Sequence, residues 1–214
     1  RVTIYLPHLV DIILYDIRVA DGASVKEVPS YERDLLCLGD SITQGMDARH
    51  PSSAYPTVIA RAIGANVLNQ GVGGDVFNVN NLDPKLPFDP DIITVAYGTN
   101  DWSRYESIGE FRSKCKDYID TLIYIYGSSQ IFVITPIWRA DIDEPKPMGE
   151  MSLLRDSIYE ICSDYSQIEM IVGRSLVPNL PHYFGDQTVH TSDEGFLHMA
   201  VNLLPYIIHE EGVM

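Results

Sequence analysis

The sequence predicts an α/β fold, in which a mostly parallel sheet is covered by helices on both faces. Short apolar runs that suit buried strands alternate with longer helical patterns from residue 34 onward, and this alternation is typical of such sheets. The chain has 214 residues and a mass of 24.0 kDa, with 45% hydrophobic and 21% charged residues. These values are those of a globular protein with one main domain rather than of a disordered or fibrous chain.

Five apolar runs are the expected strands, and they cover residues 35–38, 66–69, 91–97, 130–135 and 168–172. Each run is short, and most are rich in β-branched residues, as in strands that are buried on both faces.

Four segments with apolar residues at helical spacing are the expected helices. The first is bounded by Pro56 in its first turn and Gly64 just past its end, positions that these residue types favour. Apolar stripes within residues 111–126 and 151–162 predict two more helices. The last helical stripe, over residues 196–207, follows Thr191 and Glu194, whose spacing of three is that of a capping box.

Residues 1–30 have a different pattern. Residues 2–6 and 10–19 are rich in β-branched and aromatic side chains, and Asp21-Gly22 provides a turn signal, so two strands are expected here. We interpret residues 1–30 as a β-strand appendage, the remnant of an N-terminal β-sandwich domain. Residues 31–214 then form the main domain.

The chain is strongly acidic, with 30 Asp and Glu against 15 Lys and Arg and a formal net charge of −15. Such a surface repels phosphate backbones and anionic lipids, so neither nucleic acid nor a membrane is an expected partner. Cys37, Cys115 and Cys162 are widely spaced and lie in apolar segments, which favours buried free thiols. We therefore expect a cytoplasmic location. Secretion stays open because the chain begins with Arg1 rather than Met.

Residues that could carry chemistry follow three of the predicted strands, at residues 39–43, 69–75 and 98–101, and a fourth group lies at residues 186–190. Because the carboxyl ends of parallel strands meet at one edge of the sheet, we expect these groups to lie close together.

Their chemistry is complementary. A serine such as Ser41 becomes a nucleophile when a base, usually a histidine such as His190, takes its proton. Attack on an ester places negative charge on the carbonyl oxygen, which then needs hydrogen-bond donors. The Ser41 N–H, the Gly74 N–H and the Asn100 side-chain amide are candidate donors. Taken singly, however, Gly-Asp-Ser is also an ordinary turn, residues 71–74 a plain loop, and His190 a solvated neighbour of a helix cap.

Together the four groups resemble the SGNH (GDSL-type) hydrolases. Residues 39–43 resemble the nucleophile block of that family, 69–75 its glycine block, 98–101 its asparagine block and 190–195 its histidine block. They occur in the family's order and span about residues 34–208. The resemblance implies a three-layer α/β/α sandwich with a flavodoxin-like sheet, here preceded by a short β appendage, and makes residues 31–214 the catalytic domain.

By position, the resemblance implies that Ser41 is the nucleophile, His190 the general base, and Ser41, Gly74 and Asn100 the oxyanion hole. The third acid often stands three residues before the histidine, where this chain has Gln187. The nearest carboxylate, Asp186, is four residues before it, and a one-residue bulge would bring it to the imidazole. Asp193 or a backbone carbonyl is the alternative. Thr191 also stands where a proline is common.

Four further residues are candidates for substrate binding: Asp40, Trp102, Trp138 and Arg139. Trp138 and Arg139 follow the fourth strand, where they either wall an acyl or sugar pocket or cover a loop. Trp102 has the same two interpretations, and Asp40 is alternatively a helix cap. The resemblance implies neither a metal ion nor an organic cofactor.

The predicted function is therefore that of a serine esterase that acts through an acyl-enzyme, on small acyl groups such as acetyl carried by a carbohydrate or another polar scaffold. The expected partner is a small-molecule ester or an acylated carbohydrate. An acyltransferase with the same Ser41 and His190, or a catalytically dead carbohydrate-binding protein, is the alternative.

Overall fold

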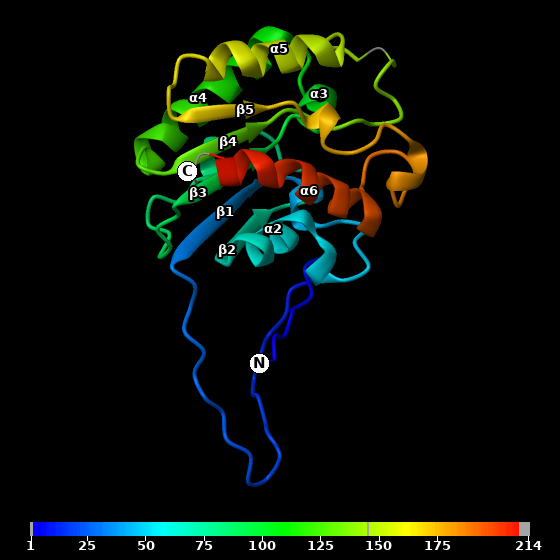
Figure 1. Ribbon diagram of the computed structural model, residues 1–214. Helices are drawn as coiled ribbons and strands as arrows, with labels where there is room; N and C mark the ends of the chain where they lie inside the picture. The colour runs from blue at the N-terminus through cyan, green and yellow to red at the C-terminus, as the bar shows by residue number, and fades with distance from the viewer. Residues whose placement is uncertain (1, 145, 210–214) are drawn as a thin grey trace.

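A computed structural model describes residues 2–144 and 146–209, and Figure 1 shows their arrangement. Five parallel strands form one sheet in the order β2-β1-β3-β4-β5. The strands are β1 (Arg33–Gly39), β2 (Ala65–Gly71), β3 (Ile92–Ala96), β4 (Gln130–Ile134) and β5 (Ile168–Ile171). This order is that of flavodoxin-like sheets and confirms the predicted fold class.

The helices are α1 (Ser41–Gln44), α2 (Tyr55–Ile63), α3 (Asp101–Arg104), α4 (Ile108–Tyr126), α5 (Met151–Cys162) and α6 (Asp193–His209). The four predicted helices correspond to α2, α4, α5 and α6. The predicted capping box is wrong by one position: the Ser192 hydroxyl accepts the N–H of Gly195 at 3.3 Å, so Ser192 rather than Thr191 caps α6.

Helices α4 and α5 lie on one face of the sheet, and α2 and α6 lie on the other (Figure 1). Alternate residues of β1 point into two separate cores. Leu36 and Leu38 pack in the core beneath α4 and α5, and Leu35 and Cys37 pack in the core beneath α2 and α6. A central strand without exposed faces explains why the sequence of β1 is a continuous apolar run.

The three cysteines are free and buried. Burial raises the pKa of Cys37 and of Cys162 to about 12, and it raises that of Cys115 well above its ordinary value. The expectation of buried free thiols is confirmed. Within residues 2–144 and 146–209, no helix has the length and apolar character needed to cross a membrane.

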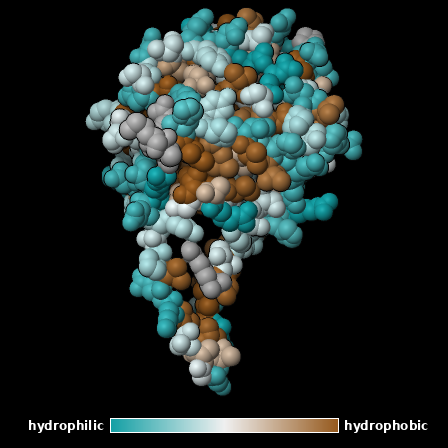
Figure 2. Space-filling view, in the orientation of Figure 1, coloured by the Kyte–Doolittle hydropathy of each residue, from teal (hydrophilic) through white to brown (hydrophobic). Residues whose placement is uncertain are grey.

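Residues 2–32 form no strand, so the two strands predicted there are wrong. His8 contacts the α/β body at Gly45. Beyond that contact the segment projects away from the body as an extended excursion (Figure 1), and Figure 2 shows hydrophobic side chains along it. Ile13 and Tyr15 are 74% and 89% exposed. A strand is stable only beside other strands and over a covered face, and this stretch has no strand partner among the described residues. Its assignment to an N-terminal β-domain remains a prediction.

Candidate active site

The nucleophile candidate lies where the strand order of the sheet reverses. β1 is flanked by β2 on one side and β3 on the other, so the loops after these three strands meet at one edge. Ser41 is the first residue of α1, directly after β1. Asp40 caps this helix by accepting the Ile42 N–H at 2.9 Å. The Ser41 N–H is in the first turn, where backbone N–H groups have no partner within the helix.

Ser41, His190 and Asp186 form a continuous hydrogen-bonded chain. The Ser41 Oγ is 2.9 Å from His190 Nε2, and His190 Nδ1 is 2.8 Å from Asp186 Oδ2. Because an ionised carboxylate only accepts hydrogen bonds, Nδ1 carries the proton and Nε2 is left to accept the Ser41 hydroxyl. The arrangement is that of a serine with an oriented base.

The loop before His190 brings Asp186 into place by a local bulge. Gln187, which directly follows Asp186, has a φ of +61°, a left-handed conformation that accommodates the four-residue spacing between Asp186 and His190. The Asp186 Oδ1 then accepts the N–H groups of Thr188, Val189 and His190 at 2.8, 2.8 and 3.1 Å. The bulge considered for the sequence is therefore present.

Asp186 stays ionised although its side chain is partly buried. Burial alone would raise its pKa. Hydrogen bonds from the N–H groups of Val189 and Thr188 and from the His190 imidazole have a larger, opposite effect, and the resulting pKa is about 2. Asp193, the alternative orienting acid, instead accepts the Arg49 N–H at 2.9 Å. The geometry therefore favours Asp186 over Asp193.

The loop that carries Gly74 passes beside Ser41, and Asn100 is tied to the same loop. A Cβ built at Gly73 would lie 3.9 Å from the Ser41 Cβ, so the glycine loop passes next to the nucleophile. Gly74 follows with a φ of +80°, a conformation that favours glycine. The Asn100 Nδ2 donates to the carbonyl oxygen of Asp75 at 2.9 Å, which ties the asparagine to the same loop.

The buried Asp101 side chain holds together the loops that carry Gly74 and Asn100. Its carboxylate accepts the N–H of Phe77 at 3.0 Å and that of Gly98 at 2.9 Å, joining the loops after β2 and β3. Burial raises the pKa of Asp101 to about 7, against the opposing effect of those two hydrogen bonds. Burial likewise raises the pKa of Asp40 to about 7.

The prediction that Asp40 and Trp102 contact the substrate is wrong, because both side chains are buried. Asp40 is 1% exposed and caps α1. Trp102 is 0% exposed, and its Nε1 donates to the Gly149 carbonyl at 2.8 Å. Both residues therefore support the loops of the site from within the core.

Arg139 is also a supporting residue in this structure. Its Nε and Nη2 contact the Asp141 carboxylate at 2.5 and 2.9 Å, its Nη1 donates to the Thr99 carbonyl at 2.9 Å, and its side chain is 11% exposed. Trp138 is half-buried and lies against Phe184, with ring centroids 4.9 Å apart. Substrate contact by Trp138 remains a prediction.

Sequence reasoning missed two residues near the catalytic chain, Gln44 and Asp47. The Gln44 side chain accepts a hydrogen bond from the Gly73 N–H in the glycine loop. Asp47, Asp186 and His190 each place a ligand atom within 4.8 Å of the others, which makes them the one group of potential metal ligands in the described part of the chain. A cation there would compete for the atoms that join Asp186 to His190. Nothing in the sequence pattern marks Asp47, because its proximity arises from tertiary packing.

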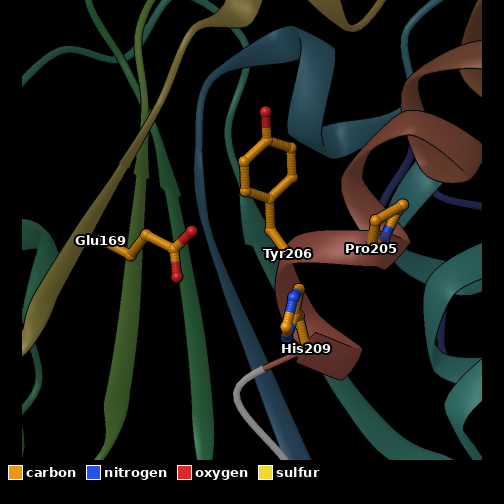
Figure 3. Close-up of a pocket in the computed structure, with 4 residues that line it drawn as sticks. All are labelled: Glu169, Pro205, Tyr206 and His209. Carbon is orange, nitrogen blue, oxygen red and sulfur yellow. The ribbon is translucent and has the colours of Figure 1, made fainter.

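A pocket of about 400 Å³ lies elsewhere, lined by Glu169, Pro205, Tyr206 and His209 (Figure 3). His209 ends α6, whereas Asp193, near His190, begins it. At 1.5 Å per residue these ends are about 24 Å apart. This pocket is therefore not part of the catalytic arrangement.

Comparison with known proteins gives one family match. The family described as GDSL-like Lipase/Acylhydrolase matches residues 37–196, a range that includes Ser41, Asp186 and His190. No curated protein matches the chain.

Solved structures share the fold at low sequence identity. A putative GDSL-like lipase from Bacteroides ovatus ATCC 8483 has a TM-score of 0.70 and 20% identity, covering 86% of this chain and 55% of its own. A carbohydrate esterase family 2 enzyme with a carbohydrate binding domain, from Corynascus thermopiles (Myceliophthora fergusii), has a TM-score of 0.71 and 15% identity, covering 90% and 70%. A salicylyl-acyltransferase from a tetracycline biosynthetic pathway has a TM-score of 0.68 and 16% identity, covering 90% and 58%. The chain thus spans little more than half of two of these proteins.

Proposed function

Because the chain belongs to the GDSL-like lipase/acylhydrolase family, we propose that it is a serine esterase that cleaves carboxylic esters through an acyl-enzyme. The observation that carries the proposal is the hydrogen-bonded chain from Ser41 through His190 to Asp186, with distances of 2.9 and 2.8 Å. A serine, an imidazole and a carboxylate in this order are the groups that acyl transfer requires.

In the first half of the reaction, the Ser41 Oγ attacks the ester carbonyl carbon while its proton passes to His190 Nε2. The negative charge that forms on the carbonyl oxygen is held by the N–H groups of Ser41 and Gly74 and the amide of Asn100. Collapse of this intermediate breaks the bond to the alcohol oxygen, which takes the proton from His190 and leaves. The acyl group remains on Ser41.

In the second half, His190 Nε2 takes a proton from a water molecule, whose oxygen attacks the acyl carbon. The bond to the Ser41 Oγ breaks, the proton returns to Ser41, and the carboxylic acid leaves. Throughout, the ionised Asp186 holds the imidazole in one tautomer and stabilises its protonated form. Its low pKa of about 2 supports this role across the neutral range.

For the substrate, we propose small acyl groups, acetyl above all, on a carbohydrate or another polar scaffold. The formal net charge of −15 supports a polar, uncharged scaffold over an anionic lipid surface. The similar fold of a family 2 carbohydrate esterase supports the same class. Hydrolysis of acetylated oligosaccharides, compared with acetyl, butyryl and longer nitrophenyl esters, tests it; preference for the longest esters would contradict it.

The structural similarity to an acyltransferase supports a second candidate, acyl transfer to an alcohol by the same residues. Product analysis with and without an alcohol acceptor separates the two reactions. A binding protein without activity is tested by a fluorophosphonate probe, which labels an activated serine. Labelling that is absent from the folded wild type would favour that alternative.

For the domain organisation, we propose that residues 1–30 are the remnant of an N-terminal β-sandwich domain and that residues 31–214 form the catalytic domain. The exposed apolar side chains of the projecting segment support this division. Protease treatment of the present chain should cut within residues 9–30 and leave the α/β body intact. Resistance of the segment to cleavage would contradict the proposal.

A further inference from the structure

Gln44 joins two segments that meet beside the nucleophile. Its Oε1 accepts the N–H of Gly73 at 2.9 Å, and its Nε2 donates to the backbone carbonyl of His8 at 3.1 Å. We propose that Gln44 is a positioning residue that holds the glycine loop against Ser41 and links its placement to the docked N-terminal segment. This inference rests on the proposed esterase function.

The hydrogen bond from the Gly73 N–H to Gln44 lies where a small shift of the glycine loop would affect catalysis. Gly73 immediately precedes Gly74, whose N–H is a proposed oxyanion donor. A Cβ at Gly73 would be 3.2 Å from the Gln44 Oε1 and 3.9 Å from the Ser41 Cβ, so the amide, the loop and the nucleophile are in contact range. Loss of the Gln44 acceptor therefore frees the peptide next to the donor.

The two contacts of Gln44 depend on each other. A side-chain amide has an acceptor at one end and a donor at the other. Rotating it by half a turn would place NH₂ against the Gly73 N–H and oxygen against the His8 carbonyl. The His8 carbonyl therefore helps to hold the Gln44 Oε1 toward Gly73.

The His8 side chain anchors the N-terminal segment at the same place. Its Nε2 lies 2.8 Å from the carbonyl oxygen of Gly45, the residue that caps the C-terminal end of α1. A Cβ at Gly45 would be 3.1 Å from the His8 Cδ2, and the φ of Gly45 is +98°, so glycine provides both the turn and the space for the imidazole. The route thus runs from His8 through Gln44 to Gly73.

The test measures nitrophenyl acetate hydrolysis by the full chain and its variants. Gln44→Met keeps the length of the side chain and removes both hydrogen bonds. We expect kcat to fall about tenfold with KM changed less than about twofold, because a misplaced oxyanion donor loses part of its about 10²–10³ contribution. Gln44→Glu restores an acceptor for Gly73 and should recover part of kcat. Gln167→Met, the same change before β5, is the matched control and should leave kcat unchanged.

A double-mutant cycle with His8→Ala tests the link itself. His8→Ala alone should lower kcat by less than Gln44→Met, and the double variant should be no slower than Gln44→Met, since the route is already broken. His50→Ala, on the exposed surface, is the control. Wild-type kcat in Gln44→Met, or fully additive effects in the cycle, would overturn the inference. If Gln44→Met fails to fold, His8→Ala in the wild-type and Gln44→Glu backgrounds gives the same comparison.

The proposed function is checked separately with Ser41→Ala. Turnover that survives this change shows that the esterase proposal is wrong. Turnover that is lost in Ser41→Ala but unchanged in Gln44→Met shows that the inference alone is wrong.

Discussion

The Nε2 of His190 lies 2.9 Å from the Oγ of Ser41, although 149 residues separate the two in the chain. Ser41 starts α1 at the end of β1, and His190 precedes α6, which covers the same face of the sheet as α2. The contact therefore exists only when the sheet and this helical layer are assembled, so activity reports on the intact fold.

Removing the Ser41 hydroxyl should abolish turnover without unfolding the protein. We expect Ser41→Ala to lower kcat by a factor on the order of 10⁶, as nucleophile deletions do. Steady-state kinetics measures the loss, and circular dichroism checks the fold. Ser175→Ala, at an exposed serine, is the control. Near-normal turnover in Ser41→Ala would end the esterase proposal.

The orienting acid is identified by comparing two Asp→Asn changes. Asp186→Asn removes the acceptor of the His190 Nδ1 proton and should lower kcat by a factor on the order of 10⁴. Asp193→Asn should leave kcat close to that of the wild type, because Asp193 contacts the Arg49 N–H rather than the imidazole. The reverse order of effects would transfer the role to Asp193.

Asn100→Ala tests the side-chain donor of the oxyanion hole. Loss of one such donor should lower kcat by about 10²–10³ with little change in KM. Asn202→Ala is a matched control, because the Asn202 amide also donates to a backbone carbonyl, that of Leu176, at 2.9 Å. Equal kinetic effects of the two substitutions would indicate a structural rather than a catalytic role for Asn100.

The buried Asp101 carboxyl should make the free energy of unfolding fall with rising pH. Burial raises its pKa in the folded protein to about 7, whereas an unfolded Asp titrates near about 3.9. The folded state therefore holds a proton that the unfolded chain has released, so this stabilising contribution is complete below about pH 4 and is lost as the pH rises to about 7.

Urea unfolding at several pH values measures this effect. Asp101→Asn should flatten the decline between about pH 4 and 7, whatever its effect on absolute stability. Asp156→Asn, at an exposed site on α5, should leave the slope unchanged. An unaltered slope in Asp101→Asn would show that folding does not raise the pKa of Asp101.

The two tryptophans should respond differently to substitution. Trp138→Ala should raise KM if its half-buried ring contacts the substrate. Trp102→Phe should lower the thermal midpoint but leave KM unchanged, because the Trp102 side chain is fully buried. A raised KM in Trp102→Phe with an unchanged thermal midpoint would return Trp102 to the substrate site.

The sequence predicts most of the sheet because its strands are apolar runs between clear turn residues. β1, for example, contains the continuous apolar run 35–38, and residues 39–43, where the strand ends, resemble a nucleophile block. The strand order follows from the family resemblance, and the grouping of Ser41, Asn100 and His190 at one edge follows from the parallel strands.

Other features depend on contacts between distant segments and leave no local pattern. The burial of Trp102, the contact of Arg139 with the Thr99 carbonyl and the proximity of Asp47 to His190 all arise from packing. The strands predicted in residues 2–19 failed for a related reason. β propensity describes side chains that fit a sheet, and the described chain provides no sheet for these residues.

The depth of the three cysteines has a practical consequence. Because the thiols are buried and their pKa values are raised, they should not react with maleimides or iodoacetamide in the folded enzyme. Opening of either core would expose at least one thiol to alkylation. Cys37 lies in the core beneath α2 and α6, whereas Cys115 on α4 and Cys162 at the end of α5 belong to the core on the other face. Mass spectrometry of pulse-alkylated peptides would thus show, without an engineered label, which side of the sandwich comes apart first.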